Sequence, residues 1–293
     1  MVIFVALGST AFGGDPTWLA GLDPSKPASL CGAQKRFLAR FPITSPNQAQ
    51  GLFELWDFYG ASISANQGAF NPLDEGLIGD QYFEVTAALR TGKRTAIDAM
   101  FARIPRVKQR MAPYLACGYS IVVDFDDTIM LDSSPVFLRA IQDRIQPGLW
   151  TYVQLYLTQN PYWLEYDGGL AIPLDRLRSR IRRWEKLRNE NSSILPLTSH
   201  IDWALHLMFE LYLCGLPNSL PFDDYGRMTD DARASYEQFL RLNTGSREYQ
   251  LVASALANVK KHDWRLNQEL IQLYDAHGYS TGYLKTELDR LHQ

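Results

Sequence analysis

The spacing of apolar and polar positions in the first third of the chain is that of amphipathic helices. Helix starts are marked by a proline that follows a capping residue, as in Asp15-Pro16 and Ser45-Pro46. The pattern predicts helices over residues 27–41, 46–59, 80–90, 95–104 and 105–116. A stretch rich in Gly, Asn and Pro, residues 66–79, separates the second helix from the third and is read as a linker or a surface loop.

After Gly118 the pattern changes, and short apolar runs alternate with longer amphipathic segments. The short runs cover residues 120–124, 193–198, 219–222, 249–253 and 280–284, and the amphipathic segments cover 135–145, 199–214, 229–242 and 258–276. Such alternation is typical of a parallel sheet with helices on both faces. We therefore expect a helix-rich α/β fold with a small parallel, Rossmann-like sheet. An all-α fold is the alternative, because a buried helix turn produces the same short runs.

The change of pattern also predicts the domain organisation. Residues 1–118 are expected to form a helical N-terminal region, and residues 119–293 an α/β core with a helical cap insertion at about 147–191. The three cysteines, Cys31, Cys117 and Cys214, are far apart and are expected to be buried free thiols in a reducing, cytoplasmic compartment.

The composition limits the classes of partner. Apolar residues make up 46% of the chain and charged residues 21%, as in ordinary globular proteins, and the net charge of -3 does not favour nucleic acid. The apolar residues 1–8 lack the basic residues of a signal peptide and are too few to span a bilayer. We expect a buried strand there, and a soluble protein that does not enter a membrane.

The segment that indicates chemistry begins at Ser120, where β-branched residues lead into Asp124, Asp126, Asp127 and Thr128. Residues at i and i+2 of a strand end point the same way, so Asp124 and Asp126 are expected to face one pocket at the carboxyl end of the sheet. Neighbouring carboxylates, here Asp124, Asp126 and Asp127, suit Mg2+, which neutralises their repulsion and holds a phosphoryl oxygen. One carboxylate can then act as nucleophile and the second as acid/base.

The run Asp124-Phe-Asp126-Asp127-Thr128 resembles the opening motif of the haloacid dehalogenase superfamily, in which apolar residues precede Asp-x-Asp-x-Thr. The resemblance extends over roughly residues 120–284. It implies a Mg2+-dependent phosphoester hydrolase that acts on a small phosphorylated substrate. It further implies that Asp124 forms a phospho-aspartyl intermediate and binds the metal, and that Asp126 is the general acid/base.

The later elements of the resemblance are less complete. Thr198, at the end of an apolar run, matches the residue that binds the phosphoryl group, with a helix N-cap as the alternative interpretation. Arg227 stands about where the family has a lysine, although a guanidinium lacks the compact geometry of an ammonium group. Ser254 and Asn258 stand where acidic metal ligands are expected. The sequence is therefore as compatible with an inactive relative as with an active phosphatase.

The predicted insertion contains a strongly basic helix. Its basic residues are Arg176, Arg178, Arg180, Arg182, Arg183, Lys186 and Arg188. A cap that presents arginines can select anionic substrates through bidentate contacts. However, Leu174, Leu177, Ile181 and Trp184 form an apolar stripe at helical spacing, which favours an amphipathic helix with a solvated basic face.

Two other classes of protein fit parts of the sequence. An aromatic-rich helical chain with an acidic cluster at Asp126 and Asp127 resembles a class I terpene synthase, which binds a prenyl diphosphate through Mg2+. In that interpretation Asn243, Ser246 and Glu248 are a compressed second metal motif. The remaining class is a non-catalytic interaction protein, which the helical first third and the non-acidic later motif favour.

Overall fold

The computed structural model of the 293-residue chain describes residues 16–66, 80–91, 93–123, 129–132, 134–159 and 164–292. The chain divides into two compact units, Met1–Val153 and Gln154–Gln293, each with its own buried core. The domain boundary predicted after residue 118 falls within the first unit. The strand predicted at residues 1–8 lies outside the described residues.

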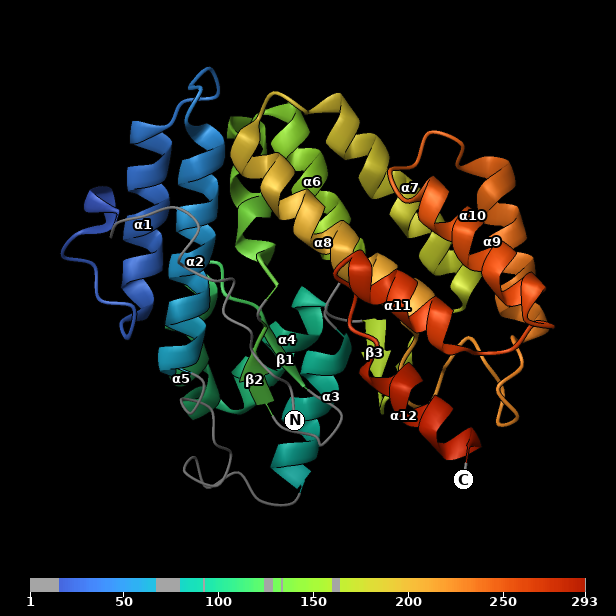
Figure 1. Cartoon of the computed structure of the whole chain (residues 1–293). Coiled ribbons are helices and arrows are strands. Elements are labelled where there is room, and N and C mark those ends of the chain that lie inside the picture. Colours follow the sequence, from blue (N-terminus) through green and yellow to red (C-terminus); the bar gives the residue numbers. More distant parts are fainter. Residues whose placement is uncertain are drawn as a thin grey trace. The chain divides into compact units, whose positions relative to one another are not determined.

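The described part of the first unit is mostly helical. Helices α1 and α2 lie side by side (Figure 1), and α4 packs against both α3 and α5. The elements are η1 (Thr17–Leu19), α1 (Pro27–Arg40), α2 (Gln48–Asn66), α3 (Asp80–Thr91), α4 (Arg94–Arg103), α5 (Pro105–Ala116), β1 (Ile121–Val123), β2 (Ile129–Leu131), η3 (Val136–Arg144) and α6 (Pro147–Gln159), which continues into the second unit. The helices predicted for this region are confirmed, and the second of them extends to residue 66.

Aromatic side chains form much of the core of the first unit. The ring of Tyr59, buried on α2, lies 4.7 Å from the ring of Phe137 and 5.5 Å from that of Tyr119. Its hydroxyl donates a hydrogen bond to the backbone carbonyl of Asp132 at 2.6 Å. Burial of each such ring contributes about 1.5–3 kcal/mol. Helix α2 therefore contacts Tyr119, two residues before β1, and Asp132, the residue directly after β2.

Strands β1 and β2 form an antiparallel pair in which Val123 lies opposite Ile129 and Ile121 opposite Leu131. Strand β1 confirms the strand predicted over residues 120–124. The acidic segment, residues 124–128, connects these two paired strands and lies outside the described residues. The helix predicted over residues 135–145 is present as the 3-10 helix η3.

The prediction of three free thiols is wrong for two of them. Cys31 of α1 and Cys117, directly after α5, form a disulfide with Cα atoms 5.0 Å apart, although 86 positions separate them in the sequence. The packing of α1 against α5 brings the two cysteines together, and sequence spacing carries no sign of that packing. Cys214 is a buried free thiol, as predicted. The cytoplasmic location stays a prediction.

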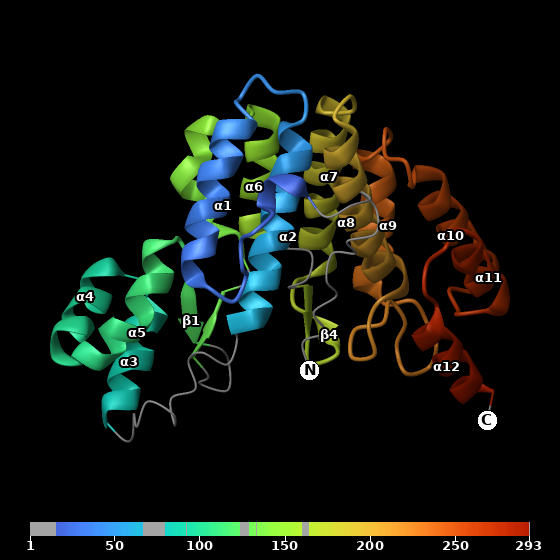
Figure 2. The ribbon, with the colours of Figure 1, turned by 90° about the vertical axis from the view of Figure 1, so that its left-hand side faces the viewer.

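The second unit is also mostly helical. Helix α9 packs against α7 and α10, α7 packs along α8, and α11 packs against α10 and α12 (Figure 2). Its elements after α6 are β3 (Glu165–Tyr166), β4 (Gly169–Leu170), α7 (Leu174–Glu190), α8 (Leu195–Cys214), α9 (Asp230–Leu242), α10 (Tyr249–Lys261), α11 (Gln268–Ala276) and α12 (Gly282–Leu291). The insertion predicted at 147–191 thus comprises α6, β3, β4 and α7.

The helix-rich character of the prediction is confirmed, but the parallel sheet is not found within the described ranges. The strands described there form two antiparallel pairs, β1–β2 and β3–β4. The apolar runs at 193–198, 249–253 and 280–284 belong to the starts of α8, α10 and α12, and the run at 219–222 contributes only isolated bridges. In α10 the apolar face continues through the buried Ala255 and Val259, so the run is one turn of a longer helical pattern.

The helix predicted over residues 258–276 is interrupted. Asp263 and Trp264 have positive φ angles of 55° and 61° between α10 and α11, which a helix cannot accommodate. The side chain of Asn267 then caps α11 by accepting from the Leu270 N–H at 3.0 Å. Among the helices described here, none has the length and apolar character needed to cross a membrane.

Candidate functional site

The predicted nucleophile and metal ligands cannot be located relative to other side chains. Asp124, Asp126 and Asp127 lie outside the described residues. They belong to the first unit, whereas Thr198 and Arg227 belong to the second. The described strand β1 precedes this segment in the chain, and the described strand β2 follows it.

Thr198 lies within helix α8, not at the end of a strand. Its side chain is buried, and Oγ1 donates to the backbone carbonyl of Leu195 at 3.0 Å. Its N–H donates to the carbonyl of Ile194, the N-cap residue of α8. Hence neither interpretation of Thr198 from the sequence, strand end or N-cap, describes its position.

Arg227 and the two non-acidic positions also lie in ordinary structural contexts. The Arg227 side chain is 55% exposed and pairs with the exposed Asp263 at 3.8 Å. Ser254 lies on an exposed face of α10. Asn258 on the same helix donates to Glu269 at 3.3 Å and accepts from Asn267 at 3.0 Å, so it joins α10 to α11.

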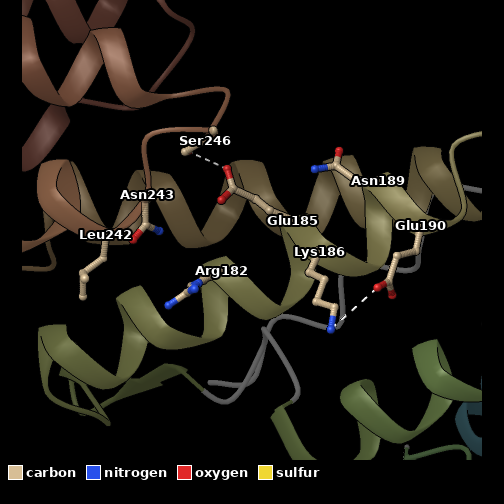
Figure 3. Close-up of a pocket in the computed structure, with 9 residues that line it drawn as sticks. Arg182, Glu185, Lys186, Asn189, Glu190, Leu242, Asn243 and Ser246 are labelled. Carbon is tan, nitrogen blue, oxygen red and sulfur yellow. Dashed lines mark hydrogen bonds and ion pairs between the residues drawn. The ribbon is translucent and has the colours of Figure 1, made fainter.

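A polar groove in the second unit is the best-defined candidate site. It has a volume of about 480 Å³ and lies between α7 and the turn that joins α9 to α10 (Figure 3). Its lining residues from α7 are Arg182, Glu185, Lys186, Asn189 and Glu190, and those from α9 and the turn are Leu242, Asn243, Gly245 and Ser246. The volume lies in the range of sites for small molecules.

The sequence produces this groove through the amphipathic pattern of α7. Leu177, Ile181, Trp184 and Leu187 are buried, so Arg182, Glu185 and Asn189 fall together on a flank of the helix beside the buried face. Helix α9 ends at Leu242, and the chain turns away to start α10 at Tyr249. The turn therefore passes beside the polar flank of α7.

Glu185 fixes the turn to α7. Its Oε1 accepts a hydrogen bond from the hydroxyl of Ser246 at 2.6 Å (Figure 3), and Ser246 Oγ in turn accepts from the N–H of Glu248 at 3.2 Å. Partial burial raises the pKa of Glu185, and hydrogen bonds from Ser246 and from the backbone of Arg247 offset part of that rise. This carboxylate is therefore primarily an anchor that gives the groove its shape.

Asn243 brings an unused hydrogen-bond donor to the groove. The residue is only 6% exposed, and its Nδ2 has no hydrogen-bond partner among the described residues. Its backbone angles, φ -122° and ψ 38°, do not demand asparagine. Leaving a buried amide donor unpaired costs about 1–3 kcal/mol. Neither the backbone nor the described contacts explain why asparagine stands here.

Arg182 adds an unpaired positive charge to the same groove. Within the described part of the chain it has no acidic partner, whereas Lys186 pairs with Glu190 at 3.6 Å. Figure 3 shows Arg182, Glu185 and Lys186 along α7, with Asn243 and Ser246 on the turn that faces them. The groove is thus lined by a residue whose amide donor is buried and by a guanidinium that has no acidic partner among the described residues.

The second metal motif predicted for a terpene synthase falls beside this groove. Ser246 is bonded to Glu185, and Glu248 accepts from Arg247 Nε at 3.0 Å. In the described ranges, no group of His, Cys, Asp or Glu side chains is placed to hold a metal ion. Asn243 and Ser246 were thus singled out from the sequence, but for a different chemistry, and Glu185 was not singled out at all.

Comparisons with protein-family models, with curated proteins and with solved structures find no match for this chain.

Proposed function

We propose that the second unit binds a small organic anion in the groove between α7 and the α9–α10 turn. The observation that carries this proposal is the buried Nδ2 of Asn243, a donor that has no partner among the described residues. A buried polar group without a partner is rare in native proteins and calls for an explanation by a ligand or by strain. An acceptor oxygen of a ligand supplies the missing hydrogen bond when the Asn243 side chain turns its amide toward the groove.

The other side chains of the groove define the chemistry of that ligand. Arg182 offers its planar guanidinium to a carboxylate or a phosphate, with which it forms two parallel hydrogen bonds. Leu242 is 49% exposed and offers an apolar contact in the same groove. A molecule with an anionic oxygen group and a short apolar part satisfies both.

A panel of small carboxylates and organic phosphates tests the proposal by thermal shift, followed by calorimetric titration of any hit. Binding that is weakened by both Asn243→Leu and Arg182→Gln supports the groove as the site. Lys260→Gln is the matched control, because Lys260 is an exposed cation on α10 that does not line the groove. Equal weakening by Arg182→Gln and Lys260→Gln would refute the proposal, since only a diffuse charge effect would remain.

A second candidate function is hydrolysis of a phosphate ester through Asp124. It rests on the resemblance of the acidic segment, which strand β1 directly precedes, although β1 pairs with the antiparallel β2 and not with a parallel sheet. In this proposal Asp124 attacks the phosphorus and displaces the alcohol of the ester, to which Asp126 gives a proton. Asp126 then takes a proton from the water that hydrolyses the phospho-aspartyl intermediate, and phosphate leaves. Asp124, Asp126 and Asp127 are the residues that would hold Mg2+. Thr198 is left out, because its hydroxyl is committed to Leu195, and the terpene-synthase alternative stays a prediction.

Hydrolysis of an aryl phosphate with and without Mg2+ tests this second candidate. Asp124→Asn is expected to abolish turnover, and the matched control Asp143→Asn, which removes the same charge from an exposed position, is expected to retain it. Turnover that persists in Asp124→Asn would exclude Asp124 as the nucleophile.

A further inference from the structure

The basic residues of α7 fall into two groups. One group has acidic partners: Arg178 pairs with Asp175 at 3.2 Å, Lys186 with Glu190 at 3.6 Å, and Arg188 with Asp202 at 2.8 Å. The other group, within the described ranges, has none: Arg176, Arg180, Arg182 and Arg183. Acidic residues are therefore available around α7, and within the described ranges these four arginines do not pair with them.

Three of the unpaired residues form an arginine cluster: Arg176, Arg180 and Arg183. Their spacing, i, i+4 and i+7, places them on one side of α7. Arg182 is not part of the cluster, since it lies about 100° around the helix from Arg183 and about 160° from Arg180. The arginine cluster and the groove thus occupy different sides of the same helix.

The guanidinium groups of the arginine cluster influence one another. The pKa of Arg180 is lowered, first by partial burial and then by the positive charges of Arg176 and Arg183. A solvated basic face accounts for Arg176 and Arg183, which are exposed. It does not account for Arg180, which is half-buried beside two like charges and, in the described part of the chain, has no acidic partner.

We propose that the arginine cluster is a binding site for a molecule that carries a diphosphate group. Guanidinium groups bind phosphate oxygens through paired hydrogen bonds, and an anion relieves the repulsion among three neighbouring cations. A single phosphate monoester carries a charge of only about -1.5 to -2 near neutral pH, which leaves three arginines incompletely neutralised. A diphosphate matches the charge of the cluster better. The proposal is independent of the groove and of the acidic segment.

Calorimetric titration of the full chain with inorganic diphosphate tests this proposal, at constant ionic strength and with EDTA present to remove any metal-dependent binding. The wild type is expected to bind diphosphate more tightly than inorganic phosphate. Arg180→Gln is expected to weaken diphosphate binding by about tenfold or more, as the loss of charge-assisted hydrogen bonds implies. Lys260→Gln, which removes one positive charge from an exposed position of α10 outside both the cluster and the groove, is the matched control and should leave the affinity within about twofold.

Several outcomes would overturn the proposal: no binding of diphosphate by the wild type, no preference over phosphate, or equal weakening by Arg180→Gln and Lys260→Gln. Circular dichroism and thermal unfolding establish whether Arg180→Gln is folded. If it is not, the double variant Arg176→Gln/Arg183→Gln decides, because both side chains are exposed. A parallel titration with a nucleoside diphosphate separates two sources of the group: tighter binding than free diphosphate indicates an organic diphosphate, and weaker binding indicates the free anion.

Discussion

Replacing Asn243 by leucine separates a ligand-binding role from a structural one, because the two roles predict opposite effects on stability. Leucine has the same number of side-chain heavy atoms and the same branching as asparagine, and the backbone angles of this position are open to it. The substitution removes a buried donor that has no partner among the described residues. Such a donor costs about 1–3 kcal/mol, so Asn243→Leu is expected to stabilise the free protein by about 1–2 kcal/mol and to raise Tm by a few degrees.

The same variant is expected to bind groove ligands at least about tenfold more weakly, because the ligand loses a buried hydrogen bond. Urea unfolding followed by circular dichroism measures the first effect, and calorimetric titration measures the second. Asn243→Ala is the control for side-chain volume, since it removes the donor but also leaves space and is expected to be no more stable than the wild type. A loss of stability of 1 kcal/mol or more in Asn243→Leu would refute the reasoning, because it would show that the amide already has a partner in the free protein.

Three further predictions concern stability. Burial lowers the pKa of His200 to about 4. The neutral, buried imidazole therefore contributes its full stabilisation above pH 6.5. This stabilisation, roughly 3 kcal/mol or less, is lost as the pH falls toward 4. Urea unfolding at pH 7, 5.5 and 4 should show a steeper loss for the wild type than for His200→Gln, and equal slopes would contradict the assignment. Reduction of the Cys31–Cys117 disulfide, which spans 86 positions, should destabilise the first unit by roughly 4–5 kcal/mol; a Cys31→Ser/Cys117→Ser variant should be insensitive to reductant. Gly215 has a φ of +72°, and an added Cβ would lie 2.6 Å from the carbonyl oxygen of Ser219, so Gly215→Ala should cost about 1–3 kcal/mol. Gly60→Ala, a helical position with open space around the new Cβ, should be neutral or stabilising in the same thermal-unfolding assay.

The helices of the first third were predictable because their signals are local. Pro27 and Pro105 stand at the first turn of α1 and α5, where proline costs no hydrogen bond. The strands predicted from short apolar runs in the second half are wrong, because such runs also occur within helices. In the run at 193–198, Pro196 occupies the first turn of α8 and is itself the signal of a helix start. Giving more weight to that proline than to the apolar run leads to the correct element.

The candidate site was less predictable than the fold, because it depends on contacts between distant residues. Glu185 meets Ser246 across 61 positions, and only the packing of α7 beside the α9–α10 turn brings them together. Asn243 and Ser246 drew attention through a metal-motif pattern, but what makes Asn243 informative is its burial without a partner, which no sequence pattern contains. The acidic segment at residues 124–128 stays a prediction, supported by the strand that leads into it.

The disulfide between Cys31 and Cys117 closes a covalent ring around α2, α3, α4 and α5. A protease that cuts once anywhere inside this ring leaves two fragments that still migrate as one chain on a non-reducing gel. A cut in the stretch between Cys117 and the acidic segment instead releases two separate pieces. Comparison of reduced and non-reduced digests therefore shows whether the chain is first cleaved inside or outside the ring.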